Sequence, residues 1–237
     1  MGKRSAIIII LLLPLLLSAK PPEPQEQKTV QAVRANGPIN IDGVLDETAW
    51  QEEGYSDFIQ SDPTDGAQPT EKTKVWVAYD EKSLYVAARL YDSQPELITS
   101  RLGRRDDFVD SDWFIFAVDP YYDRRSGYQF AVNPAGSIVD WTLLNDEWND
   151  STWDGVWEWK ALIDKEGWTV EIRIPYNQLR FPKKEEYVWA MSPVLPNFWE
   201  SRIFVLAGSL SSFPSLLSRP NTAPKNQATL SRLDKNI

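Results

Sequence analysis

The amino-acid sequence predicts an all-β protein, an antiparallel, jelly-roll-like β-sandwich with at most short helical turns. Two observations support this fold class. Short segments that alternate between apolar and polar residues recur along the chain, as expected for strands with one buried face. Turn-forming residues separate these segments, and no amphipathic helix lies between them, which disfavours a parallel α/β fold.

The first predicted hairpin lies at residues 74–91. Residues 74–79 (KVWVAY) alternate as a half-buried strand should, residues 80–83 form a polar turn, and residues 84–91 (LYVAARLY) form the second strand. Residues 112–119 (DWFIFAVD) are strongly apolar, which indicates a strand at the centre of a sheet.

Two further hairpins follow. Strands at residues 128–133 and 137–143 flank a Pro-Ala-Gly turn, and strands at residues 155–163 and 168–174 flank a polar turn. The last strand has the clearest period of two. Its apolar face carries Trp168, Val170, Ile172 and Ile174, and its other face carries Thr169, Glu171 and Arg173. Short helical turns are expected only near residues 47–51 and 176–179.

The start of the chain has the layout of a secretory signal peptide. Lys3 and Arg4 precede an apolar run at residues 6–17, and Ser18 and Ala19 offer a small-residue cleavage site. The run is shorter than the ~20 residues that a membrane-spanning helix needs. The expected organisation is a signal peptide at 1–19, a linker at 20–35, the sandwich at 36–190 and an atypical tail at 191–237. The protein is therefore expected to be exported to the periplasm, the outer membrane or the medium.

The tail differs in composition from the rest of the chain. Ser, Leu and Pro become frequent and alternation is poor after about residue 200. Two interpretations stay open: a poorly ordered segment, or an irregular closing strand around residues 203–207. The change of composition also suggests that the reading frame is truncated or shifted near residue 191.

Composition restricts the available chemistry. The chain contains neither Cys nor His, and its formal net charge is −9. The commonest general base and zinc ligand is therefore missing. A strongly acidic chain is also a poor partner for nucleic acid, because phosphate binding needs clustered Lys and Arg. No catalytic residue and no cofactor other than Ca²⁺ is expected.

Acidic residues cluster at 106–112 and 146–154. Three interpretations fit them: solvated loops, a carboxylate pair for glycoside hydrolysis, or a structural Ca²⁺ bound by Asp110, Asp112 or Asp150. In the preceding segment 101–107 (RLGRRDD), basic and acidic side chains predict surface ion pairs, and the alternative is the polar rim of a binding site.

Tryptophan is the most informative residue type. The chain has 11 Trp, and Trp141, Trp148 and Trp153 are candidate ligand-binding residues. Trp148 and Trp153 lie in a polar stretch (NDEWNDSTWDG), where a large apolar side chain needs an explanation. An indole can stack on the C–H face of a sugar ring while nearby polar groups bind the hydroxyls. The alternative is that this loop folds back and buries both rings.

Several stretches follow one another in a specific order and spacing. They are residues 41–47 (IDGVLDE) with Trp50, 73–80 with 84–86, 111–119, 127–128, 133–136 (NPAG), 153–157 (WDGVW), and 167–182. Together they resemble family 9 of the carbohydrate-binding modules, in the branch found at the start of large bacterial outer-membrane-associated proteins. The resemblance covers roughly residues 36–190 and implies an antiparallel β-sandwich with a carbohydrate-binding lineage. It also implies that a barrel-like region would normally follow.

The resemblance further implies where a ligand would lie. Sugar-binding members clamp the ligand between aromatic residues, and the first of these falls at Phe108 in this sequence. Gln129 and Asn133 stand where polar contacts are retained, whereas an apolar residue, Ile115, replaces an expected acidic one. The fold can therefore persist while the site changes.

Three functional hypotheses follow. The first is an exported, non-catalytic module that binds oligosaccharide or polysaccharide. The second is a structural module that contacts protein or other components of the cell envelope and binds no free sugar. The third is a glycosidase that uses two carboxylates.

Overall fold

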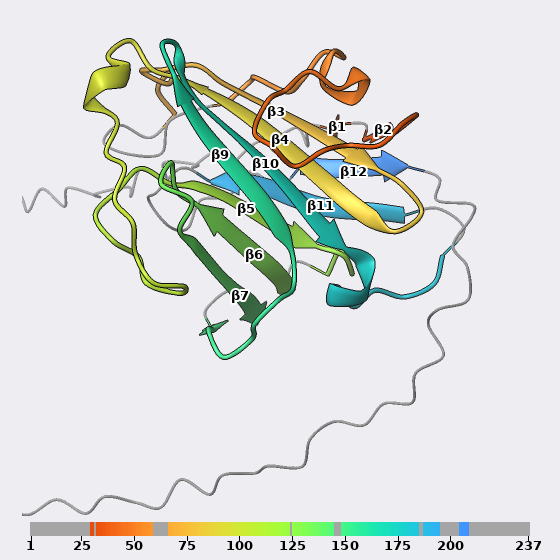
Figure 1. The fold of residues 1–237 in the computed structure, drawn as a ribbon. Coiled ribbons are helices and arrows are strands. Elements are labelled where there is room, and N and C mark those ends of the chain that lie inside the picture. Colours follow the sequence, from red (N-terminus) through yellow and green to blue (C-terminus); the bar gives the residue numbers. More distant parts are fainter. Residues whose placement is uncertain are drawn as a thin grey trace, which may run out of the picture.

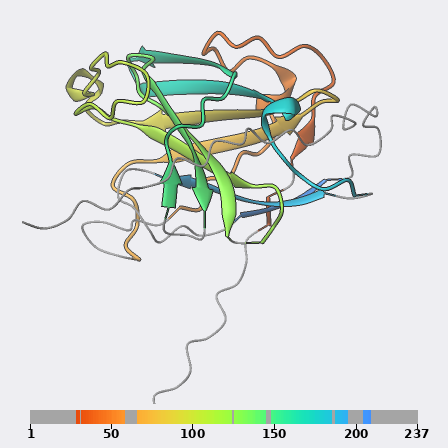
Figure 2. The same cartoon turned by 90° about the horizontal axis from the view of Figure 1, so that it is seen from below.

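The computed structural model describes residues 29–30, 32–58, 66–123, 125–144, 148–184, 187–194 and 204–208. These residues form two β-sheets stacked as layers of a sandwich, which confirms the predicted fold class (Figures 1 and 2). One described sheet has seven strands in the order β1-β12-β11-β5-β6-β7-β8, and the other has five in the order β2-β3-β4-β10-β9. Neighbouring strands are antiparallel except in two short parallel pairs, β1 with β12 and β2 with β3.

The seven-stranded sheet contains β1 (Thr29–Val30), β5 (Phe114–Asp119), β6 (Ser126–Val132), β7 (Ile138–Leu144), β8 (Trp148–Asp150), β11 (Tyr187–Val194) and β12 (Phe204–Gly208). The five-stranded sheet contains β2 (Val33–Arg34), β3 (Thr73–Tyr79), β4 (Ser83–Tyr91), β9 (Glu158–Asp164) and β10 (Gly167–Pro175). The described helical elements are single 3₁₀ turns, η1 (Thr48–Trp50), η2 (Pro95–Leu97) and η3 (Tyr176–Gln178).

The core lies between the two sheets. Alternate residues of each strand point into it, so the apolar face of β10 is buried as the sequence predicts. Opposite it, Phe114, Phe116 and Phe130 of the seven-stranded sheet are almost completely buried. Burial of large apolar side chains is the main favourable contribution to the stability of such a sandwich.

The predicted strands and turns are present with shifts of a few residues at their ends. The described structure adds β8, a short strand within the polar stretch 145–155, and β11, which continues to Val194. The closing strand also forms, because β12 pairs with both β11 and β1. Residues 1–28 and 209–237, which include the expected signal peptide and most of the tail, lie outside the described residues.

A long N-terminal segment, residues 36–50, crosses the outer face of the five-stranded sheet (orange in Figures 1 and 2). The anchor of this segment is Glu171 of β10, which is fully buried. Its carboxylate accepts hydrogen bonds from the backbone N–H of Asp42 (3.0 Å) and Gly43 (2.7 Å) and from the indole N–H of Trp50 (2.9 Å). Burial raises the pKa of Glu171 to about 7, because desolvation penalises the charged form.

In the described part of the chain, no helix has the length and apolar character needed to cross a bilayer.

Candidate functional site

An aromatic cluster lies on the outer face of the seven-stranded sheet, on the side away from the core. The ring of Phe108 contacts the indole of Trp113 (centroids 4.7 Å apart) and the indole of Trp141 (5.3 Å). The two indoles are buried, but Phe108 is 43 % exposed. Ile115 and Val139 of the same face pack beneath them. The cluster thus presents one exposed aromatic ring that rests on a buried apolar base.

Gln129 of β6 lies beside this cluster. In the strand register it is the direct neighbour of Trp141 on β7 and of Ala117 on β5. Its amide oxygen accepts a hydrogen bond of 2.7 Å from the Trp141 indole N–H. Gln129 is 6 % exposed, and its amide nitrogen makes no hydrogen bond to any described residue, so this nitrogen is a candidate donor to a hydroxyl group at this face.

The loop of residues 99–113 carries Phe108, and its base is fastened to the turn between β6 and β7. Asn133 is fully buried, and its amide group donates to the Arg101 carbonyl (2.7 Å). Ser137 accepts a hydrogen bond from the Gly103 N–H (2.7 Å) and donates its own backbone N–H to Asn133 (2.8 Å). The structure therefore places Asn133 beneath the loop and not at the surface, where it holds the loop in position.

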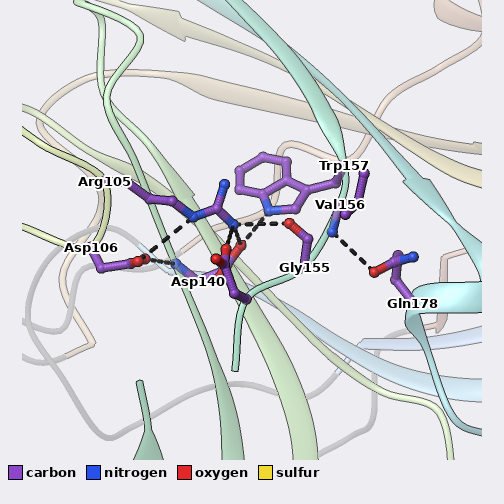
Figure 3. Close-up of polar contacts among 8 residues, drawn as sticks. Arg105, Asp106, Asp140, Gly155, Val156, Trp157 and Gln178 are labelled. Carbon is purple, nitrogen blue, oxygen red and sulfur yellow. Dashed lines mark hydrogen bonds and ion pairs between the residues drawn. The ribbon is translucent and has the colours of Figure 1, made fainter. Parts of the chain in front are cut away.

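The tip of the loop is fastened by Arg105 (Figure 3). Its guanidinium donates to the carboxylate of Asp140 (2.6 Å) on β7 and to the Gly155 carbonyl (2.9 Å). Ion pairs join it to Asp154 (2.5 Å) and to its neighbour Asp106 (3.6 Å). Arg105 thus connects the tip of the loop to β7 and to the segment that leads into β9.

Asp140 is the buried partner in this network. Its side chain is completely inaccessible and also accepts a hydrogen bond from the indole N–H of Trp157 (2.5 Å). Burial raises the pKa of the Asp140 carboxyl, while the bond from Trp157 and the charge of Arg105 act in the opposite direction. A carboxylate in this position can anchor a loop, but it cannot touch a substrate.

The structure brings three of the six predicted binding residues together: Phe108, Gln129 and Trp141. Trp153 lies elsewhere, because its half-buried ring packs against Tyr128 and Phe130 at the edge of the core (centroids 5.0 and 5.9 Å). For Trp153, the structure thus shows the alternative in which the loop folds back and packs the ring against the sandwich. The backbone of Trp148 forms part of β8, and its side chain lies outside the described residues.

The three candidate Ca²⁺ ligands lie in separate local arrangements. Asp110 is exposed and forms an ion pair with Arg101 (3.7 Å). Asp112 accepts a hydrogen bond from the Thr99 N–H (3.0 Å), and Asp150 accepts two from Thr152. Among the described residues, no group of three or more Asp, Glu, Cys or His side chains has a geometry that could hold a metal ion.

Trp113 and Arg105 take part in the site although sequence reasoning did not single out either. Trp113 lies at the start of a strongly apolar strand, where a Trp is indistinguishable from a core residue. Arg105 belongs to a segment that predicts surface ion pairs, and the pair with Asp106 is such a pair. Its bond to Asp140 joins residues 35 positions apart, which no local pattern indicates.

Comparisons with known proteins show which solved structures share this fold. No family model matches the chain, and no curated protein matches it. A solved structure, a putative carbohydrate-binding protein from Bacteroides uniformis, matches with a TM-score of 0.54 at 12% identity, over 82% of this chain and 94% of that chain. The shared fold is thus the β-sandwich expected from the resemblance to family 9 modules.

Two structures of a family 9 carbohydrate-binding module from Caldicellulosiruptor kristjanssonii also match, each with a TM-score of 0.48. The module in complex with cellotriose is 18% identical, over 70% of this chain and 75% of that chain. The module in complex with glucose is 17% identical, over 70% of this chain and 78% of that chain.

Proposed function

We propose that this protein is a non-catalytic carbohydrate-binding module whose site is the outer face of the seven-stranded sheet around Phe108. One observation carries the proposal: an exposed aromatic ring is held by two buried indoles beside an amide donor, that of Gln129. A flat apolar ring can stack on the C–H face of a sugar, and an adjacent amide can bind a hydroxyl. The fold neighbour from Bacteroides uniformis, described as a putative carbohydrate-binding protein, is consistent with this function.

The arrangement of the carboxylates favours binding over catalysis. Asp140 is fully buried, and Asp106 and Asp154 both pair with the same guanidinium. Glycoside hydrolysis needs two carboxyl groups that flank the scissile bond, with one protonated and the other free to act as base or nucleophile. Because Asp140 is inaccessible and the other two carboxylates share one guanidinium, this cluster is poorly suited to either role.

We also propose that the protein is exported and acts in the periplasm, at the outer membrane or outside the cell, where it binds oligosaccharide or polysaccharide. The support is the signal-peptide pattern at residues 1–19. Expression of the full chain in a bacterium, followed by fractionation and N-terminal sequencing, tests this. A mature protein that begins near Lys20 is expected, and a full-length protein that stays in the cytoplasm would overturn the proposal.

Titration calorimetry tests the binding function. The chain from Lys20 onward is titrated with cello-, xylo-, malto- and manno-oligosaccharides, with Ca²⁺ and with a chelator. At least one sugar should give saturable heat. Phe108→Ala should weaken its binding at least tenfold, which corresponds to about 1.4 kcal/mol. The matched control is Leu102→Ala, since Leu102 lies in the same loop and is 76 % exposed, and it should leave the affinity unchanged.

The absence of heat with every sugar, from a protein with native circular dichroism, would overturn the binding proposal. It would favour the structural module that contacts protein or the cell envelope.

A further inference from the structure

We propose that Arg105 is a positioning residue for the carbohydrate site: its bond to Asp140 holds the tip of the 99–113 loop so that the Phe108 ring rests on the two indoles before any ligand arrives. This inference rests on the proposed function. It assigns Arg105 and Asp140 a role in affinity although neither is part of the aromatic surface.

The base of the loop is fixed independently of Arg105. Asn133 and Ser137 hold residues 101 and 103, and at the far end the Asp112 N–H donates to the Thr99 carbonyl (3.0 Å). These contacts close the loop at its start and its end. They do not reach residues 104–109, where Phe108 lies, so the position of the tip needs a separate explanation.

Contacts other than those of Arg105 also reach the tip, including a bond from the Trp113 indole N–H to the Val109 carbonyl (3.1 Å), but among the described residues none of them involves a buried charge. The Asp106 N–H donates to the Ile138 carbonyl (3.0 Å), and the carboxylate of Asp106 accepts a longer bond from the Asp140 N–H (3.3 Å). Asp106 adopts a left-handed backbone conformation with φ of 64°. A residue other than glycine pays an energetic cost for this conformation, which persists only when the surrounding contacts impose it.

Arg105 supplies the strongest of those contacts. One terminal nitrogen of its planar guanidinium, Nη2, makes three of these contacts: its two hydrogens are donated to Asp140 and to the Gly155 carbonyl, and it forms an ion pair with Asp154. The bond to Asp140 is the decisive one because that carboxylate is completely buried and is not screened by solvent. Asp154 is 71 % exposed, so its ion pair contributes little.

A loosened tip would lower affinity without removing any group that touches the ligand. When the tip samples several positions, the sugar must order it on binding, and that entropic cost is subtracted from the affinity. The Phe108 ring would also leave the indoles of Trp113 and Trp141 for part of the time. The positioning role therefore predicts a change in the free protein and a change in the dissociation constant.

The experiment uses the double variant Arg105→Met with Asp140→Asn. Arg105→Met alone would leave a buried, unpaired carboxylate, which could prevent folding. The double variant removes both charges and keeps an amide oxygen that can accept the bond from Trp157. Arg104→Met is the matched control, because Arg104 is the exposed neighbour in the same loop and its side chain forms no hydrogen bond or ion pair with described residues.

Three quantities are measured in the chain from Lys20 onward. The first is amide hydrogen exchange at residues 104–109, with residues 83–91 of β4 as the internal reference. The second is the near-ultraviolet circular dichroism that Phe108→Ala removes. The third is the dissociation constant for the sugar found in the titrations. The double variant should exchange about tenfold faster at the tip only, lose the Phe108 signal, and bind sugar about fivefold more weakly. Arg104→Met should match the parent protein in all three.

Two results would overturn the inference: unchanged exchange and circular dichroism at the tip, or a loosened tip with unchanged affinity. If the parent protein binds no sugar, the proposed function fails by itself. Hydrogen exchange and circular dichroism then still decide whether Arg105 holds Phe108 on the indoles.

Discussion

The two outer faces of the sandwich are each covered by a segment that is anchored on a buried carboxylate, but the two coverings differ in kind. Residues 36–50 bind Glu171 through neutral N–H donors, and their large side chain, Trp50, is only 3 % exposed. The 99–113 loop binds Asp140 through a charged, partly exposed arginine and leaves an aromatic ring in solvent. The first covering completes a core, whereas the second creates a surface suited to recognition.

This difference separates stability from binding. Removing the anchor of the first segment should mainly lower the free energy of unfolding, because several buried donors lose their acceptor together. Changes at the second segment should mainly alter affinity, because much of that segment already contacts water.

Glu171→Ala should have the largest effect on stability. The substitution leaves the N–H groups of Asp42, Gly43 and Trp50 without their acceptor in a buried site. The free energy of unfolding should fall by about 3–5 kcal/mol, measured by urea denaturation at pH 5.5. Glu158→Ala is the control, since Glu158 forms an exposed ion pair with Arg173 and should cost less than about 1 kcal/mol. Equal losses in the two variants would contradict the assigned anchor.

The stability should also depend on pH through Glu171. Its pKa is about 7 in the folded protein against an ordinary value of 4.5, so the folded state binds more protons between these values. The stabilisation present below pH 4.5 is therefore lost as the pH rises toward 7, by up to about 3 kcal/mol. Glu171→Gln cannot titrate, so its stability relative to the parent should increase over this range. A difference that stays constant from pH 4.5 to 8 would refute the prediction.

Gln129→Leu, on the outer face of the seven-stranded sheet, should lower both the free energy of unfolding and the affinity for sugar. The buried indole N–H of Trp141 loses its acceptor, which should cost about 1–2 kcal/mol of unfolding free energy. Loss of the amide donor should also weaken sugar binding roughly tenfold. Gln178→Leu serves for comparison, because Gln178 accepts an exposed bond from Val156 on a distant segment. Calorimetry that gives the two variants the same affinity would exclude Gln129 from the site.

Asp154→Asn should have the smallest effect. Its side chain is 71 % exposed, so the ion pair with Arg105 is screened and should contribute less than about 1 kcal/mol. The loss should shrink further in 0.5 M NaCl, as measured by thermal unfolding. A loss as large as that of Asp140→Asn would mean that the exposed partner, not the buried one, fixes the loop.

The strands were predictable because their signals are local. Alternation and turn residues identify β3, β4, β6, β7, β9 and β10 directly from the sequence. The covering segments were not predictable in the same way. The period of two in β10 places Thr169 and Glu171 on its polar face, yet both are buried because residues 36–50 lie over them. A contact between residues more than 120 positions apart leaves no periodic trace in either segment.

The candidate site was only partly predictable, because it too is formed by residues that lie far apart in the sequence. The resemblance to family 9 modules identified Phe108 and Gln129, which do lie beside Trp141. The polar context of Trp153 suggested an exposed ring, but the ring packs against Tyr128 because a loop can fold back over the edge of a sandwich. Sequence alone does not show which aromatic side chains the tertiary fold leaves in solvent.

Sugar binding over Phe108 is tested most directly by a titration followed by the ¹⁵N-indole resonances of the tryptophans, assigned by Trp→Phe variants. If sugar binds over Phe108, the resonances of Trp113 and Trp141 should shift with the same saturation curve, and that of Trp50 on the opposite outer face should not move. Shifts confined to Trp153, with Trp113 and Trp141 unchanged, would place the ligand elsewhere and contradict the account.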